Sequence, residues 1–387
     1  MSEGVSRYVT VTELGRVLRP PTLGWLDLEL TERCNNDCRH CCINLPLDDA
    51  DARAGEMSTE RIKAILDEAV DLGLLVLRIT GGEPLVRDDF EEIYLYARRL
   101  GLSVILCTNA RRVTPQLARV FAEIPPLRPV EVTVYGMSEA SYEAMTRRKG
   151  SFVEFRRGID LLVQASIPLT LSGAFRPPYL EEMRALRDWV AELPNVVGTP
   201  NQVMFYDLRW RRESPARNRS IAQLRAVPEE VLEAGALVAG HEPVTLEFCR
   251  KFIGPGGEKV FSCGIGQRPC VDAYGFLQPC TALRDPSLTY DLAAGSLRDA
   301  VTVAFPRLLD TRATDPSYLE RCARCFLMGL CQQCPARSYS EHGVLDRPVE
   351  YQCEVAQAQA RRMGLLKSGE RPWEVNDWKE RIACLTE

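Results

Sequence analysis

The chain has 387 residues, of which 45% are hydrophobic and 26% are charged, and its formal net charge is −5. This composition is that of an ordinary globular protein, and the negative charge excludes a general nucleic-acid binder, because phosphate binding shows as a basic excess. Since single hydrophobic cores stop growing at about 250–300 residues, we expect two domains, a large one and a smaller one.

The N-terminal residues mix charges such as Glu3, Arg7 and Glu13 with their apolar positions, so they offer no core for a signal peptide. No later segment reaches the roughly 18 apolar residues of a membrane span. We therefore expect a cytoplasmic protein with no membrane partner. Thiols are kept reduced in the cytosol, so the 15 cysteines indicate metal ligands or catalytic groups before they indicate disulfides.

Short β-rich runs alternate with amphipathic helical stretches from Trp25 to about Leu208, which is typical of βα units around a parallel sheet. The expected strands are Trp25–Leu30, Val76–Thr80, Ser103–Thr108, Val130–Tyr135, Leu169–Phe175 and Gln202–Leu208. Six units are too few to close an eight-fold barrel. We therefore predict an α/β fold, a partial (β/α)6 TIM-like barrel with a lateral opening for a large substrate. Chemistry in such barrels lies at the C-terminal ends of the strands.

The first expected helix of these units shows the sequence signals of a helix start, an apolar stripe and a helix end. Ser58 can cap its N-terminus, apolar residues recur from Ile62 to Val70 at helical spacing, and Gly73 can end it. The proposed domain limits are 1–22 for an N-terminal lead-in, 23–215 for the barrel, 216–257 for a connector, 258–360 for a cysteine-rich domain of small α+β character, and 361–387 for a C-terminal tail. The connector follows a basic segment, RWRRESPARNR, and includes an expected helix from Pro228 to Val238.

Cys34, Cys38 and Cys41 form a C-x3-C-x2-C pattern directly after the first expected strand. A [4Fe–4S] cluster needs one ligand for each iron, so three cysteines leave one iron open for a small molecule that offers an amine and a carboxylate. A zinc site is the alternative for three closely spaced cysteines. Cys42, Cys107 and Cys384 are expected to be structural thiols.

This pattern, at this place in the chain, is the signature of the radical S-adenosylmethionine (SAM) superfamily, which the sequence resembles. Gly81, Gly82 and Glu83 follow the second strand and resemble the family's GGEP motif, whose glycines let the backbone approach SAM. By the same resemblance His40 lies near adenine and Thr133 contacts the ribose. Asn109 resembles a strand-end TNG segment of the family.

The resemblance implies an enzyme in which a reduced cluster donates one electron to bound SAM, and the resulting 5′-deoxyadenosyl radical abstracts hydrogen from the substrate. An external one-electron reductant of the flavodoxin or ferredoxin type is then required. The protein supplies a dry pocket and the orientation of the reactants.

A second group of cysteines resembles the SPASM extension of these enzymes, in which two auxiliary iron–sulfur clusters, expected here as [4Fe–4S], are bound. Carried over by position, the first cluster takes Cys263, Cys280 and Cys334, and Cys270 completes it unless Cys249 does. The second takes Cys322, Cys325, Cys331 and Cys353. The spacing before Cys334 is one residue shorter than in the family pattern. A pair of zinc knuckles is the alternative.

Relatives with this extension act mostly on peptides or proteins, so the resemblance implies a peptide or protein substrate that is crosslinked, oxidised or epimerised. A small-molecule metabolite such as a tetrapyrrole is the alternative, and a non-catalytic metal-binding scaffold comes from a different class. Thr281 stands where sulfatase maturases carry an Asp that acts as a catalytic base, which argues against that activity. Few residues precede the first strand, so we expect either a separate protein that binds a leader peptide or no leader at all. Asp207 and Arg209 are candidates for substrate contact at the end of the sixth strand.

Overall fold

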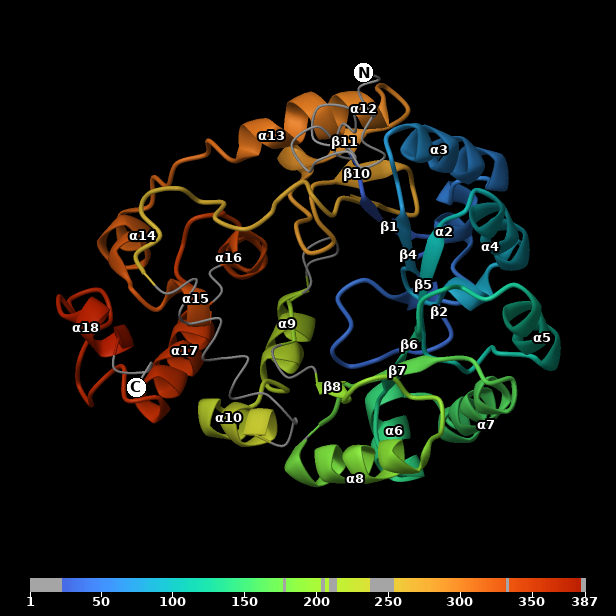
Figure 1. The fold of residues 1–387 in the computed structure, drawn as a ribbon, viewed down its shortest axis with the longest axis horizontal. Helices are drawn as coiled ribbons and strands as arrows, with labels where there is room; N and C mark the ends of the chain where they lie inside the picture. Colours follow the sequence, from blue (N-terminus) through green and yellow to red (C-terminus); the bar gives the residue numbers. More distant parts are fainter. Residues whose placement is uncertain are drawn as a thin grey trace, which may run out of the picture.

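The computed structural model describes residues 23–176, 179–202, 206–208, 214–236, 254–331 and 334–383. Its centre is an open sheet whose strands follow the order β11-β10-β9-β1-β4-β5-β6-β7-β8 (Figure 1). The strands from β1 to β8 in this order are parallel. They are β1 (Trp25–Glu29), β4 (Val76–Thr80), β5 (Ser103–Thr108), β6 (Val130–Val134), β7 (Leu169–Gly173) and β8 (Asn201–Gln202).

These strands confirm the predicted partial barrel, and the first five lie within the expected ranges. The sixth covers only Asn201–Gln202 among the described residues, and positions 203–205 of the predicted strand lie outside them. Within the described part of the chain the sheet does not close, because β8 pairs only with β7 and β11 only with β10.

Helices cover the outer face of the sheet. They are α2 (Ala50–Gly55), α3 (Thr59–Asp71), α4 (Phe90–Arg99), α5 (Pro115–Glu123), α6 (Glu139–Thr146), α7 (Ser151–Gln164) and α8 (Tyr179–Glu192), with a short 3₁₀ turn η1 (Pro84–Val86). The Ser58 side chain accepts a hydrogen bond from the Arg61 amide at the start of α3, as predicted, and Gly73 follows its end with a φ of 93°. α3 therefore begins and ends at the expected residues.

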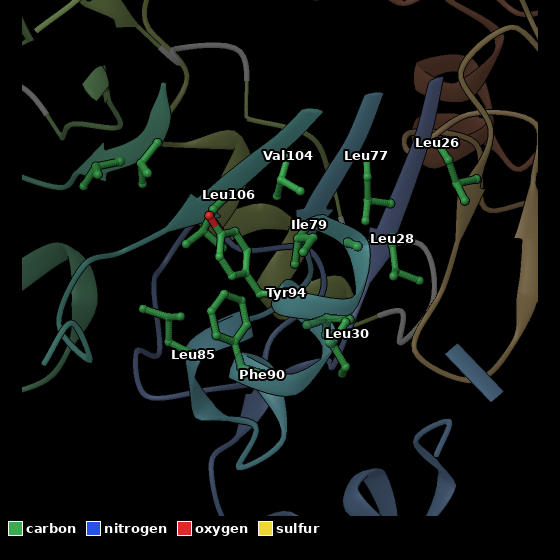
Figure 2. Packing of buried hydrophobic residues seen from close by; sticks show 14 of the residues in the cluster. Leu26, Leu28, Leu30, Leu77, Ile79, Leu85, Phe90, Tyr94, Val104 and Leu106 are labelled. Atoms are coloured by element: carbon green, nitrogen blue, oxygen red, sulfur yellow. The ribbon is translucent and has the colours of Figure 1, made fainter. Parts of the chain in front are cut away.

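Alternate residues of each strand divide the sheet into an apolar outer face and a polar inner face. Leu28, Leu77 and Leu106 point toward α4, where Phe90 and Tyr94 pack against the strands (Figure 2). Asp27, Glu29, Arg78 and Glu131 occupy the intervening positions and face the interior of the barrel. The hydrophobic core thus lies between sheet and helices, and the interior of the barrel is left for polar chemistry.

The cysteine-rich region joins the same sheet. β9 (Cys270–Val271) pairs with β1 in parallel, and β10 (Phe276–Gln278) and β11 (Tyr290–Asp291) extend it antiparallel. Val271, Leu277 and Leu297 therefore belong to the main core. The first part of the region expected as a cysteine-rich domain thus packs directly on the barrel.

Short helices make up the rest of the C-terminal half. They are η2 (Pro286–Leu288), α12 (Leu297–Asp299), η3 (Ala300–Ala304), α13 (Phe305–Leu308), α14 (Pro316–Glu320), η4 (Cys322–Arg324), α15 (Met328–Cys331), α16 (Pro335–His342), α17 (Glu350–Arg362) and α18 (Trp378–Ala383). The connector contains α9 (Pro215–Ala222) and α10 (Pro228–Ala236), the second of which matches the helix expected from Pro228. The domain limits stay predictions. None of the described helices is both long and apolar enough to cross a membrane.

Candidate active site

The first three cysteines lie in a loop that leaves the C-terminal end of β1, and we call residues Cys34–Asn44 the cluster loop. β2 (Arg33–Cys34) and β3 (Leu45–Pro46) pair in parallel and bring the two ends of this loop together. Cys34 and Cys38 are buried and Cys41 is partly buried. Burial raises the pKa of Cys34 and of Cys38, and the neighbouring thiols raise both further. The three sulfur atoms are therefore gathered in one place.

Backbone amides point at the sulfur atoms of this loop. The Asn36 amide donates to Cys34 Sγ and the Asn44 amide donates to Cys41 Sγ, each at 3.3 Å. Such bonds favour the thiolate, which is the form that binds metal. The loop thus fits an iron–sulfur cluster, and metal binding would displace the thiol protons that burial otherwise retains.

Buried ion pairs hold the backbone segment that leads into the cluster loop. Glu56 accepts hydrogen bonds from Arg33 at 2.7 Å and lies 3.5 Å from the guanidinium of Arg87, and all three side chains are at most 7% exposed. Arg87 also donates to the carbonyl groups of Leu30 and Met57. The backbone on either side of Cys34 is held by charge-assisted bonds in a dry environment, where they are strong.

Gly81 and Gly82 bring the turn after β4 against the residues that precede the first cysteine. A Cβ atom on Gly82 would lie 2.3 Å from the Arg33 carbonyl oxygen, and one on Gly81 would lie 2.3 Å from that of Thr31. Gly81 also has a φ of 132°. Glycine is required here because the two backbone segments approach too closely for any side chain.

Glu83 is fully buried and joins the turn after β4 to the end of β5. Its carboxylate accepts hydrogen bonds from the Leu85 amide at 3.1 Å, the Thr108 hydroxyl at 2.8 Å and the Asn109 amide at 2.7 Å. Burial raises its pKa, against these bonds. The Asn109 side chain in turn donates to Asn35 Oδ1 at 2.8 Å. Among the described contacts, Glu83 and Asn109 hold the cluster loop from the side of the sheet.

His40 lies between two tyrosine rings, with ring centroids 5.8 Å from Tyr135 and 4.9 Å from Tyr206. Burial, followed by the charge of Arg217, lowers the pKa of His40 to about 4, so the imidazole is neutral at physiological pH. Its Nδ1 atom is buried and has no hydrogen-bond partner among the described residues. This is an unsatisfied polar atom in an aromatic setting, which suits a planar, hydrogen-bonding ligand.

Thr133 lies on β6 on the interior face, opposite Ser172 of β7. One layer below it, the wall of the barrel is charged: Arg78 lies 3.1 Å from Glu131 and 3.8 Å from Asp27. The Cys107 thiol donates to Glu131 at 3.1 Å, and its burial raises its pKa. Cys107 is thus a partnered thiol in the barrel wall.

Cys322, Cys325, Cys331 and Cys353 line one cavity, which we call the second cysteine cavity. Burial raises the pKa of Cys322 and that of Cys325 to about 12, and in both cases the Cys353 thiol contributes. The Leu327 amide donates to the sulfur of Cys325. The four cysteines that the resemblance assigns to one cluster are therefore brought together from three separate elements.

Cys263, Cys280 and Cys334 form another group. Burial raises the pKa of Cys280 to about 11, and the neighbouring thiols of Cys334 and Cys263 contribute to this rise. Cys263 accepts a hydrogen bond from the Ile265 amide. Cys270 is fully buried on β9, where its thiol donates a hydrogen bond to the Val271 carbonyl group. Its thiolate form would help to raise the pKa of Arg284. Cys249 lies outside the described residues.

Within the described part of the chain, no three His, Cys, Asp or Glu side chains converge closely enough to hold a single metal ion. The assignment of each cysteine as a cluster ligand therefore stays a prediction.

The two candidates for substrate contact fare differently. Asp207 forms an ion pair with Arg337 of α16, with an N···O distance of 3.4 Å, and about a third of its side chain is exposed. Arg209 lies outside the described residues. Thr281, which follows Cys280, donates its hydroxyl to the buried carboxylate of Asp27 on β1. This position contacts the interior of the barrel, although it carries no acid.

Sequence reasoning missed the role of Arg217. Its guanidinium donates to the Cys38 carbonyl oxygen at 2.8 Å and lies 3.5 Å from both Asn44 Oδ1 and Asp37 Oδ1. The preceding Ser214 and Pro215 form a helix-start signal that could have placed this residue on a helix, and Ser214 does cap α9. The contact itself joins residues 179 positions apart and leaves no local signal.

Comparison with known proteins gives a family match. The sequence model described as "Radical SAM superfamily" matches residues 28–190. An AdoMet-dependent heme synthase of Methanosarcina barkeri is 30% identical over 45% of this chain and 48% of its own length. That of Nitratidesulfovibrio vulgaris is 25% identical over 84% and 90%. A PqqA peptide cyclase of Xanthomonas axonopodis is 29% identical over 54% and 56%. The chain thus spans about half the length of the first and third of these relatives.

Two solved structures show the same fold. Streptococcus suis SuiB bound to S-adenosylmethionine has a TM-score of 0.62 and 14% identity, covering 88% of this chain and 80% of SuiB. The anSMEcpe enzyme with bound AdoMet and Kp18Cys peptide has a TM-score of 0.63 and 12% identity, covering 95% and 99%. At these identities the likeness concerns the fold alone.

Proposed function

This chain belongs to the radical SAM superfamily, and on that premise we propose that it modifies a peptide or protein substrate. Members of the superfamily are enzymes that bind a [4Fe–4S] cluster and SAM, as the sequence resemblance predicted. When bound, these groups supply a 5′-deoxyadenosyl radical by one-electron reduction of SAM.

The residues of this chain hold and orient that chemistry. Cys34, Cys38 and Cys41 are the proposed cluster ligands, and the paired ends of the cluster loop keep them in place. Gly81 and Gly82 allow the backbone at the end of β4 to approach a ligand. His40, neutral and with a free nitrogen, is available to a flat heterocycle beside Tyr206.

We infer two auxiliary clusters in the cysteine-rich region. Their support is the grouping of Cys263, Cys280 and Cys334, and of the four residues of the second cysteine cavity. Candidate thiols in both groups accept backbone amides two residues further along, as Cys34 does in the cluster loop. Zinc in place of these clusters is the alternative. Metal analysis distinguishes the two, because zinc without iron in this region would replace the clusters.

The observation that supports a peptide substrate is the alignment with the PqqA peptide cyclase, which covers 216 residues at 29% identity. The name of that relative states a peptide substrate. The open sheet supports it, because an unclosed barrel gives an extended chain lateral access to the polar interior. Structures with bound peptides among the neighbours of the fold agree with this access.

A tetrapyrrole is the second candidate. The AdoMet-dependent heme synthase of Nitratidesulfovibrio vulgaris aligns over 350 residues, which is 90% of its length, although at the lower identity of 25%. This alignment is longer than that of the peptide cyclase, and the heme synthase of Methanosarcina barkeri is about as identical to this chain, at 30%, as the cyclase is, at 29%. The two substrates therefore need a direct comparison.

The test is production of 5′-deoxyadenosine by anaerobically reconstituted protein with excess reductant. Short peptides encoded beside the gene should raise this production at least about ten-fold, a difference of about 1.4 kcal/mol in the barrier. An iron porphyrin should not. Stimulation by the porphyrin alone would replace the peptide with a tetrapyrrole. Replacing Cys34, Cys38 and Cys41 by Ala should abolish SAM cleavage, while the matched control Cys384→Ala should retain it.

A further inference from the structure

A basic turn lies directly against the cluster loop. We give this name to residues Arg147–Gly150, which connect α6 to α7. The Asp37 amide donates to the Thr146 carbonyl oxygen at 2.9 Å and the Arg39 amide donates to that of Met145 at 3.0 Å. These two bonds flank Cys38 on both sides. Only two Cα steps of about 3.8 Å each separate Thr146 from Arg148.

The basic turn is exposed, in contrast to the loop that it covers. Arg148 and Lys149 are exposed, and the Arg147 side chain is 47% exposed. Arg112, which follows the end of β5, is exposed as well. Val153 is 63% exposed on the first turn of α7, directly after the basic turn in the sequence.

Acidic residues near the turn are already engaged. Asp37 pairs with Arg147 at 2.5 Å and also with Arg217. Glu154 pairs with Arg111 at 2.6 Å. Glu143 on α6 is not paired in this way, but one of its carboxylate oxygens is buried and has no hydrogen-bond partner among the described residues. The local surface is therefore positive, although the whole chain carries a net charge of −5.

We propose that the basic turn, with the exposed residues Arg112 and Val153 next to the Arg111–Glu154 pair, is the docking site for an acidic one-electron carrier protein of the flavodoxin or ferredoxin kind. The inference rests on the proposed radical SAM chemistry, which consumes one electron for each SAM cleaved. In the transfer the carrier is oxidised by one electron and the cluster held at Cys38 is reduced by one, with no proton or leaving group exchanged.

Charge complementarity makes the partner specific. A positive patch attracts a negatively charged protein and accelerates its encounter, and salt screens this attraction. The basic turn is also joined to the residues on either side of Cys38 through the Thr146–Asp37 and Met145–Arg39 hydrogen bonds. Small chemical reductants need no such surface.

The experiment compares two reductants on the reconstituted full chain. SAM cleavage is measured with purified flavodoxin, kept reduced by its reductase, and separately with excess dithionite. The variant is Arg148→Glu with Lys149→Glu. The matched control is Arg298→Glu with Arg307→Glu, two exposed residues on α12 and α13, which lie across the molecule from α6 and α7 (Figure 1).

With flavodoxin, the R148E/K149E variant should cleave SAM at least about ten-fold more slowly than the wild type at low salt, and the difference should shrink as salt rises. With dithionite the two should agree within two-fold, and the control should match the wild type with both reductants. Equal flavodoxin rates for variant and wild type, or a greater loss in the control, would overturn the docking site. Absence of SAM cleavage in the wild type with dithionite would instead refute the proposed function.

Discussion

Gly82 is a residue at which the backbone after β4 lies tightly against the segment that leads into the cluster loop. An added Cβ would meet the Arg33 carbonyl oxygen at 2.3 Å and that of Glu32 at 2.7 Å, and neither atom belongs to a flexible side chain. The clash can be relieved only by moving the segment that carries Cys34. Packing and cofactor binding are therefore coupled at a single position.

We expect Gly82→Ala to destabilise the protein by about 1–3 kcal/mol, the usual cost of overpacking, and to lower the iron bound at the cluster loop. Thermal unfolding and iron analysis after anaerobic reconstitution measure the two effects. Gly101→Ala is the matched control, because Gly101 has a φ of 83° but no atom within 4 Å of an added Cβ. It should cost about 1–2 kcal/mol through backbone strain and leave iron content unchanged. Full iron loading of Gly82→Ala would show that the approach is not required.

Among the helices, α9 has an importance for the site that its length of eight residues does not suggest. It presents Arg217 to the cluster loop, and the connector that follows presents Arg225, which forms an ion pair with Glu341 of α16. The Tyr351 hydroxyl of α17 donates to the Ala226 carbonyl oxygen at 2.7 Å. The connector thus bonds to the cluster loop at one end and to the cysteine-rich region at the other.

Arg217→Met should slow SAM cleavage about ten-fold while the protein remains folded, because hydrogen bonds to a charged group contribute about 1.5–3 kcal/mol each and their loss frees the backbone at Cys38. Activity with excess dithionite, together with circular dichroism, tests this. Arg219→Met changes the same residue type on the same helix at an exposed position and should have no effect. A loss of activity shared equally by both variants would assign the effect to α9 as a whole and not to Arg217.

The sequence allowed the barrel strands and α3 to be predicted because their signals are local: alternating or continuous apolar runs, a Ser58 cap and a terminal Gly73. The motifs at the strand ends followed, since cysteine spacing and paired glycines are also local. The pairing of β9 with β1 could not be predicted, because two-residue strands carry no periodicity. Nor could the approach of Arg217 to Cys38, since it depends on how a long connector returns across the sheet.

At the scale of the whole molecule, the C-terminal residues close the second cysteine cavity. Pro372 and Trp373 line it, and the Arg321 guanidinium lies 4.8 Å from the Trp373 ring, over its face. Leu365, Leu366 and the ring of Trp378 pack against Phe326, between Cys325 and α15. The segment expected as a tail therefore forms one wall of the cavity that holds four candidate cluster ligands and shields them in part from solvent.

Shielding of this kind predicts selective oxygen sensitivity. In Trp373→Ala the cavity opens beside Cys322 and Cys353. Air exposure should therefore release, faster than in the wild type, about four of the about twelve irons that the three proposed clusters would hold, since each [4Fe–4S] cluster holds four. The remaining eight should be lost at the wild-type rate, as followed by iron release and the loss of visible absorbance. Trp189→Ala, on the outer side of the barrel against Phe155, removes the same side chain and should leave iron release unchanged. Uniformly faster loss of all iron in Trp373→Ala would indicate general destabilisation, and unchanged loss would show that Trp373 does not protect the cavity.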